Sequence, residues 1–105
     1  MIKITGFEHI SIGAADTEPS ASVLELFGIN PVYGEDIHPH GVATTYYEHE
    51  NYDETRVRFE IIRPVDEDAP LRKFLEKRGP GVHHICMQVE NLDDAMTQIK
   101  DAGGH

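Results

Sequence analysis

Polar and apolar side chains alternate clearly over residues 55–62, where Phe59 and Ile61 fall on one face. Because successive side chains of a strand point to opposite faces, this run predicts a half-buried β-strand. Two shorter runs upstream, residues 31–33 and 42–47, are also rich in residues that favour strands. The middle of the chain is therefore predicted to be a set of short strands joined by polar turns.

Helical spacing appears in three other places. Residues 91–104 place apolar side chains at i, i+3, i+4 and i+7, after an N-cap candidate at Asn91. Residues 17–28 carry a similar apolar stripe. A third short helix is predicted over residues 70–78, between a proline at its start and Gly79 at its end.

An internal repeat relates the two ends of the chain. Residues 6–12 align with residues 81–87 with Gly, His and Ile coinciding, and each copy is followed by a predicted helix. The predicted order is β-α-β-β-β, a helical linker, then β-α. The second copy stops before three closing strands, so we expect either a truncated chain or a partner that supplies those strands.

Composition narrows the classes of function. At 105 residues the chain fits a single domain, and its net charge of −10 would repel a nucleic acid backbone. No apolar run is long enough to cross a membrane, and the N-terminus lacks a secretory pattern. A single cysteine, Cys86, excludes an internal disulfide. We therefore expect a cytoplasmic domain that binds neither nucleic acid nor membranes.

Seven histidines are the outlier in this composition, and two of them occupy the same place in the repeat. Alternation places His9 and His84 on the strand faces opposite the apolar, helix-covered faces, and it places Glu60 likewise on its own strand. Two imidazoles and one carboxylate suit a divalent metal ion with open positions for a substrate. Each residue alone is more often structural, but the coincidence predicts a metal site.

The remaining histidines and Cys86 each have a structural interpretation as well as a functional one. Alternation places His83 on the core face, as a structural residue. His38 and His40 lie in a predicted loop, either solvated or acting as a lid over a cavity, and His49 is expected at the surface. Cys86 shares a face with His84, where it is either a small buried filler or a thiolate ligand.

These features resemble the vicinal oxygen chelate superfamily, the glyoxalase/bleomycin resistance/dioxygenase group. Within it, residues 60–71, 73–79 and 81–85 closely resemble methylmalonyl-CoA epimerases. The resemblance implies an α+β fold of paired βαβββ modules. The first module would span about residues 4–64, a helical linker 65–80, and an incomplete second module 81–105.

The resemblance also implies a mechanism: epimerisation of methylmalonyl-CoA by proton abstraction, with the enolate chelated by a divalent metal. It makes His9, Glu60 and His84 metal ligands. A fourth ligand would lie beyond the end of this chain, so we do not expect the chain to be fully active alone. Co, Ni, Mn, Zn and Mg are all plausible ions. Some epimerases carry a glutamate base where this chain has Thr44, and Glu48 on the same face is a possible substitute.

The expected partner is a small thioester substrate, with a basic cluster of Arg72, Lys73, Lys77 and Arg78 as a candidate site for its nucleotide. The same cluster is at least as readily a solvated helix face. Related proteins are commonly homodimers, so a homodimer is expected. The alternatives are glyoxalase I (lactoylglutathione lyase), acting on the methylglyoxal–glutathione hemithioacetal, and a non-catalytic small-molecule binding module of the same fold.

Overall fold

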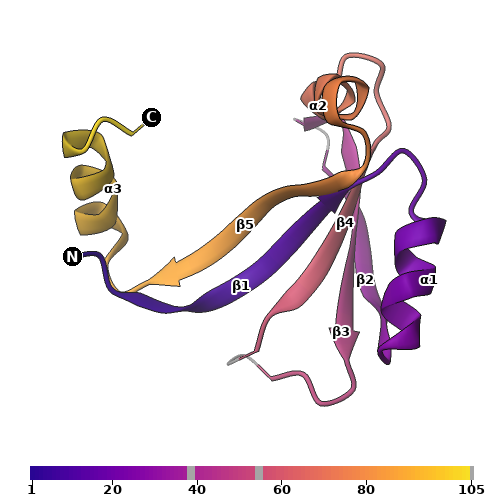
Figure 1. Ribbon diagram of the computed structural model, residues 1–105, viewed down its shortest axis with the longest axis horizontal. Helices are drawn as coiled ribbons and strands as arrows, with labels where there is room; N and C mark the ends of the chain where they lie inside the picture. Colours follow the sequence, from indigo (N-terminus) through magenta and orange to yellow (C-terminus); the bar gives the residue numbers. More distant parts are fainter. Residues whose placement is uncertain (38–39, 54–55, 105) are drawn as a thin grey trace.

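A computed structural model describes residues 1–37, 40–53 and 56–104 of the chain (Figure 1). Strands and helices follow one another in the predicted order, and the first five elements form the predicted β-α-β-β-β unit. The elements are β1 (Ile4–Gly13), α1 (Glu18–Leu26), β2 (Ile29–Ile37), β3 (Val42–His49), β4 (Arg58–Pro64), α2 (Pro70–Arg78), β5 (Gly81–Val89) and α3 (Leu92–Asp101). The α+β class is confirmed, while the division into modules stays a prediction.

The described strands form one mixed sheet of five strands, in the order β2-β3-β4-β1-β5. β1 is parallel to β4 and antiparallel to β5. The strand after the linker therefore lies beside the first strand of the chain. This pairing brings the two copies of the repeat into direct contact, and it places β4, β1 and β5 side by side.

The two faces of the sheet are covered by different helices. On one face, Leu24 of α1 packs with Tyr47 and the fully buried Ile61. On the other face, Leu71 of α2 packs with Val42 and Ile62. Neighbouring residues of β4 thus serve opposite cores, as strand alternation requires. The second core covers only part of its face and leaves room for a cavity.

Three register shifts interrupt the pairing of β1 with β5, and two of them lie beside the candidate ligands. Phe7 pairs with Met87 and His9 with Cys86, so Glu8 is an extra residue in β1. Ser11 likewise pairs with His84 and Ile12 with Val82, which makes His83 an extra residue in β5. Such β-bulges bend a strand and re-aim its side chains. The expectation that His83 lies on the core face is wrong: it is exposed and lines the cavity beside His84.

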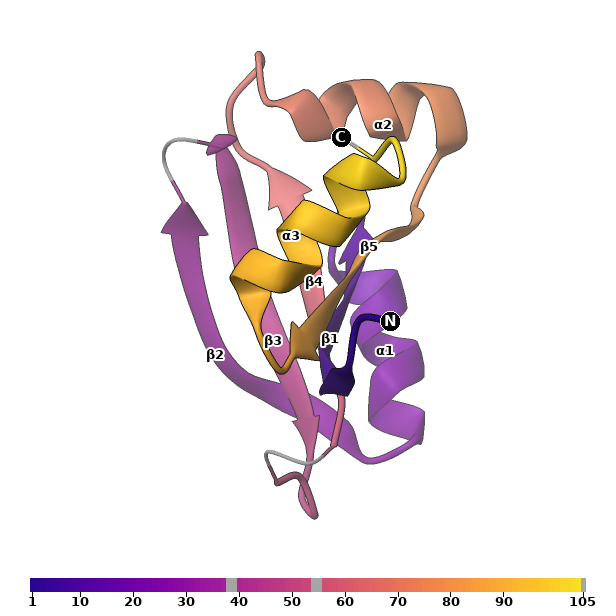
Figure 2. The same ribbon diagram turned by 90° about the vertical axis from the view of Figure 1, so that its left-hand side faces the viewer.

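β1 and β5 continue as a two-stranded ribbon away from the other helices, and α3 lies at its far end (Figure 1; α3 is in front in Figure 2). Ile85 and Met87 lie on the apolar face of β5, which alternation predicts to be covered by a helix, but both are half exposed because no described element packs over them. In α3, Asn91 caps the helix as predicted by accepting from the Asp94 amide at 3.0 Å. Only Ala95 of its apolar stripe is buried. The described residues form no helix that could span a bilayer.

Candidate metal centre

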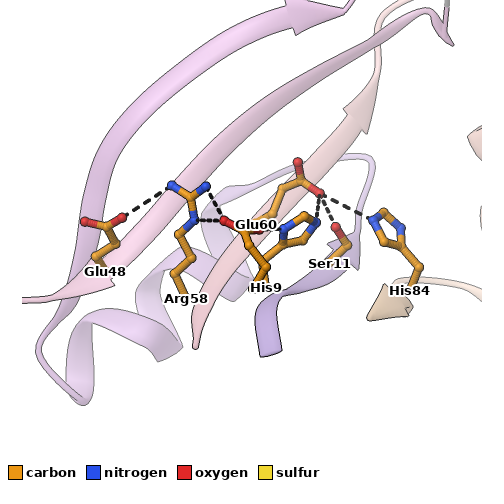
Figure 3. Close-up of polar contacts among 7 residues, drawn as sticks. His9, Ser11, Glu48, Arg58, Glu60 and His84 are labelled. Carbon is orange, nitrogen blue, oxygen red and sulfur yellow. Dashed lines mark hydrogen bonds and ion pairs between the residues drawn. The ribbon is translucent and has the colours of Figure 1, made fainter. Parts of the chain in front are cut away.

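Three adjacent strands bring the predicted ligands together. Ser11 of β1 pairs with Glu60 of β4 on one side and with His84 of β5 on the other, and His9 precedes it on the same face. Glu60 Oε1 lies 3.6 Å from His9 Nε2 and 3.8 Å from His84 Nε2 (Figure 3). All three donor atoms fall within 4.8 Å of one another. The structure thus gathers the predicted residues, while metal binding itself stays a prediction.

Glu60 is the buried member of this set, with 5% of its surface exposed. The Ser11 hydroxyl donates to its Oε1, and Tyr46 stands opposite it in the β3–β4 register. Burial and the nearby Glu60 carboxylate raise the pKa of Tyr46 to about 12. Tyr46 therefore remains a neutral phenol beside the carboxylate. A carboxylate buried among neutral groups is costly unless a cation compensates its charge.

The chemistry of this donor set fits a divalent metal ion. Ligands bound at about 2.0–2.2 Å to one ion lie roughly 3.0–3.5 Å apart. The two distances from Glu60 Oε1 exceed that range by only a few tenths of an ångström. Two imidazoles and one carboxylate are ligands that borderline divalent ions accept. Three protein ligands also leave coordination positions open for substrate oxygens.

His84 is in the protonation state that a metal ion requires. Its partial burial lowers the pKa of the imidazole, and the neighbouring His83 and His9 act in the same direction, against the Glu60 carboxylate. His84 is therefore neutral at neutral pH, and a neutral imidazole is the form that binds metals. The Nδ1 atoms of His83 and His84 lie 2.8 Å apart, so the two rings orient one another.

A row of alternating charges, which the sequence did not reveal, lies behind His9. Glu8 contacts His9 Nδ1 through one carboxylate oxygen and accepts from Arg58 Nε at 2.9 Å through the other. Arg58 also lies 3.4 Å from Glu48 and over the Tyr46 ring, 4.1 Å from its centroid. Burial raises the pKa of Glu8, but the hydrogen bonds from His9 and Arg58 outweigh it and hold the pKa below its usual value.

A cavity of about 420 Å³ opens beside the three candidate ligands. Its walls combine the metal-competent side chains with an apolar surface from β3, β4 and α2. The lining residues are His9, His40, Val42, Thr44, Glu60, Ile62, Pro70, Leu71, His83 and His84. His40 therefore borders the cavity, whereas His38, also predicted for this loop, lies outside the described residues.

The two candidate bases occupy different places. Thr44 lines the cavity, but it is almost fully buried and its hydroxyl donates to the Glu35 carbonyl at 3.3 Å. Glu48 is not among the cavity-lining residues, and its carboxylate is paired with Arg58. Neither side chain presents a free carboxylate to the cavity, and a proton-transfer role for either stays untested.

The remaining candidate residues lie in different environments in the structure. His49 is exposed at the end of β3, as expected, and accepts from the Asn51 amide. Cys86 is a free, partly buried thiol whose sulfur lies within 4.8 Å of donor atoms of Glu8 and His9. In the basic cluster, Arg72 donates to the Asp66 carbonyl at 2.6 Å. The other three members of that cluster, Lys73, Lys77 and Arg78, are exposed on α2.

Comparison with curated proteins finds epimerases. The chain is 31% identical over 97 residues to an ethylmalonyl-CoA/methylmalonyl-CoA epimerase of Cereibacter sphaeroides. The aligned residues cover 90% of this chain and 69% of that protein. It is 28% identical over 94 residues to the mitochondrial methylmalonyl-CoA epimerase of Homo sapiens, covering 88% of this chain and 51% of the human protein. The chain thus spans about half the length of the human relative.

Comparison with solved structures also finds methylmalonyl-CoA epimerases. A methylmalonyl-CoA epimerase from Mycobacterium tuberculosis superposes with a TM-score of 0.79 at 25% identity, covering 95% of this chain and 65% of that one. A Streptomyces coelicolor methylmalonyl-CoA epimerase variant, in complex with 2-nitronate-propionyl-CoA, superposes with a TM-score of 0.78 at 25% identity, covering 96% and 74%. The likeness extends over nearly all of the chain.

A family model described as the glyoxalase/bleomycin resistance protein/dioxygenase superfamily matches residues 8–105. The match includes all three candidate ligands and α2, which contributes two residues to the cavity wall. It therefore covers most of the sheet and the whole candidate site, and the protein belongs to the glyoxalase/bleomycin resistance protein/dioxygenase superfamily.

Proposed function

We propose that this chain forms the metal- and substrate-binding part of a methylmalonyl-CoA epimerase. The observation that carries the proposal is the convergence of His9, Glu60 and His84 beside a cavity with apolar walls. Epimerisation requires removal of a weakly acidic α-proton, and it therefore requires stabilisation of the negative charge that develops on the substrate oxygens. The Cereibacter sphaeroides and Homo sapiens relatives both carry epimerase names, which favours this reaction over others of the superfamily.

His9, Glu60 and His84 would hold the ion beside the cavity that they line. When bound, a divalent cation supplies Lewis-acid stabilisation of charge on the substrate oxygens. Val42, Ile62 and Leu71 give the cavity apolar walls, and a bound substrate that displaces water there would strengthen electrostatic interactions. Two neighbouring strands orient the Glu60 carboxylate: the Ser11 hydroxyl of β1 donates a hydrogen bond to it, and Tyr46 of β3 lies beside it.

We assign the proton-transfer role to His40, which lines the cavity. Thr44 has no ionisable group at the position of the family's glutamate base, and Glu48 is held by Arg58. The titratable side chains of the described cavity lining are His9, His40, Glu60, His83 and His84. Of these, His40 is neither a proposed ligand nor bonded to one, and histidine transfers protons well near neutral pH.

The exposed basic residues of α2 complete the proposed substrate site. Lys73, Lys77 and Arg78 lie on the helix whose Leu71 and Pro70 wall the cavity. A thioester inside the cavity can therefore extend its nucleotide phosphates along this helix, where positive charge attracts them. The expected homodimer and the cytoplasmic location stay predictions, and sedimentation velocity tests the first.

Deuterium incorporation tests the proposed reaction. The Co²⁺-loaded chain is incubated with chiral methylmalonyl-CoA in deuterated water, and the α-carbon is followed by mass spectrometry. We expect solvent deuterium at the α-carbon above the protein-free rate, little of it with His84→Ala or His40→Gln, and normal incorporation with the surface control His49→Ala. No incorporation by the wild type would contradict the proposal, and turnover of the methylglyoxal–glutathione hemithioacetal would favour glyoxalase I.

A further inference from the structure

We propose that Glu8 is a positioning residue that fixes the tautomer and ring orientation of His9. In this role Glu8 keeps the proton on His9 Nδ1 and leaves the Nε2 lone pair facing Glu60 and the cavity. The inference rests on the proposed metal site, because it states which nitrogen of His9 is available to an ion. Glu8 itself does not line the cavity and acts only through His9.

The two nitrogens of His9 face different carboxylates. Nδ1 is in direct contact with Glu8 Oε2, whereas Nε2 lies 3.6 Å from Glu60 Oε1. A distance of 3.6 Å is too long for a hydrogen bond, so the contact with Glu8 decides the tautomer. A carboxylate can only accept, and the proton of a neutral His9 therefore belongs on Nδ1. Pairing the second nitrogen of a ligand histidine with a carboxylate is the usual means of orienting it.

The irregularity in β1 makes this contact geometrically available. In a regular strand Glu8 and His9 would point to opposite faces. Glu8 is the extra residue between the pairs Phe7–Met87 and His9–Cys86, and this bulge lets adjacent side chains meet. The feature that re-aims Glu8 thus lies directly beside the proposed ligand.

Arg58 holds Glu8 in the orientation that this role requires. Its Nε donates to Glu8 Oε1 at 2.9 Å, which leaves Oε2 for His9. The guanidinium is itself fixed between Glu48 and the face of the Tyr46 ring. The side chains of Glu8 and Arg58 are both only about a quarter exposed, so water competes weakly for these bonds.

A rival arrangement uses the opposite side of the same imidazole. Donor atoms of Glu8, His9 and Cys86 also lie within 4.8 Å of one another. Because Glu8 faces Nδ1, an ion held by Glu8 would take the Nδ1 lone pair; a neutral imidazole has only one lone pair to give, so the two sites exclude each other. The positive charge of Arg58 on Glu8 opposes a cation at the rival site. The contacts therefore favour binding through Nε2.

The tautomer is measured directly by long-range ¹H–¹⁵N NMR of the metal-free protein at about pH 8.5, well above the ordinary pKa of a histidine side chain. We expect His9 to be protonated on Nδ1 in the wild type and in Glu48→Gln, which alters the Arg58 pairing without touching the imidazole. Glu8→Ala should populate the Nε2-protonated form while its amide spectrum stays dispersed. Nε2 protonation in the wild type, or an unchanged tautomer in Glu8→Ala, would overturn the inference.

Cobalt titration gives the second readout. We expect Glu8→Ala to weaken Co²⁺ binding about 10–100-fold, the usual effect of losing such a partner, and Cys86→Ser to leave it unchanged. An equal loss in Cys86→Ser, or a thiolate-to-cobalt absorption band in the wild type, would assign the ion to the rival site and overturn the inference. Because the tautomer is read without metal, failure of the wild type to bind cobalt would count against the proposed function alone.

Discussion

Replacing Arg58 by methionine is expected to destabilise the fold by about 2–3 kcal/mol. The substitution keeps an aliphatic stem and removes the guanidinium that bonds Glu8 and pairs with Glu48. Hydrogen bonds to charged groups contribute roughly 1.5–3 kcal/mol each, and breaking a fully buried ion pair costs about 3–5 kcal/mol. These side chains are 21–26% exposed, which places the expected loss between the surface and the buried limits.

The same change has a signature in its pH dependence. The pKa of Glu8 is lowered in the folded state, so its contribution to stability is present above about pH 4.5 and is lost as the pH falls through the folded-state pKa. Arg58→Met removes much of that contribution. The difference in free energy of unfolding between the wild type and the variant should therefore narrow as the solution becomes acidic.

Urea unfolding followed by circular dichroism measures both effects. Arg56→Met is the matched control, because Arg56 is mostly exposed and lies 3.8 Å from Asp53. Such a surface pair contributes at most about 1 kcal/mol. If Arg58→Met costs no more than Arg56→Met at pH 7, the network behind His9 does not stabilise the fold, and the reasoning is refuted.

Two further predictions concern the scaffold. Burial raises the pKa of Tyr47 above 10, aided by Glu25, so the unfolded tyrosine loses its proton first and stability falls as the pH rises through the folded-state pKa. Urea titrations between pH 8 and 11 should show a shallower loss for Tyr47→Phe, and identical slopes would contradict the burial argument. Gly41 has φ +62° and an added Cβ would lie 2.8 Å from Asp66 Oδ2. Gly41→Ala should cost more than Gly79→Ala, where φ is +70° but no atom lies within 4 Å; equal melting temperatures would refute the steric clash.

The sequence predicted the order of elements well because local signals mark their ends. Pro70 and Gly79 bracket α2 at the predicted residues, and the Asn91 cap begins α3 as expected. The sequence also predicted the three candidate ligands, because the repeat places two of them at equivalent positions and alternation places the third on the same kind of face. These are short-range patterns that a single strand or helix expresses by itself.

Other parts of the site depend on how strands pair. Strict alternation assigned His83 to the core face, but a bulge in β5 makes it an extra residue and turns it to the cavity. A bulge in β1 likewise brings Glu8 to His9. The sequence did not predict the role of Arg58, because an arginine in a strand is expected to face solvent until its partners on other strands are known. Inter-strand register decides these contacts, and one strand's sequence does not encode it.

The alternation of polar and apolar residues also failed to predict that the second repeat copy is exposed. Ile85 and Met87 follow the alternation of a covered strand, yet both are half exposed in the described structure. Met96 and Ile99 of α3 are similarly exposed despite their helical spacing. Periodicity predicts which face of an element is apolar, but only the packing of other elements determines whether that face is buried.

Metal stoichiometry tests the central claim most directly. Equilibrium dialysis against Co²⁺, with metal content measured by mass spectrometry, compares the wild type with His9→Ala, Glu60→Ala and His84→Ala, and with His49→Ala as a surface control. We predict one tightly bound ion per chain in the wild type and in His49→Ala, and loss of tight binding in the three ligand variants. Unchanged stoichiometry in His84→Ala, or no bound ion in the folded wild type, would contradict the account.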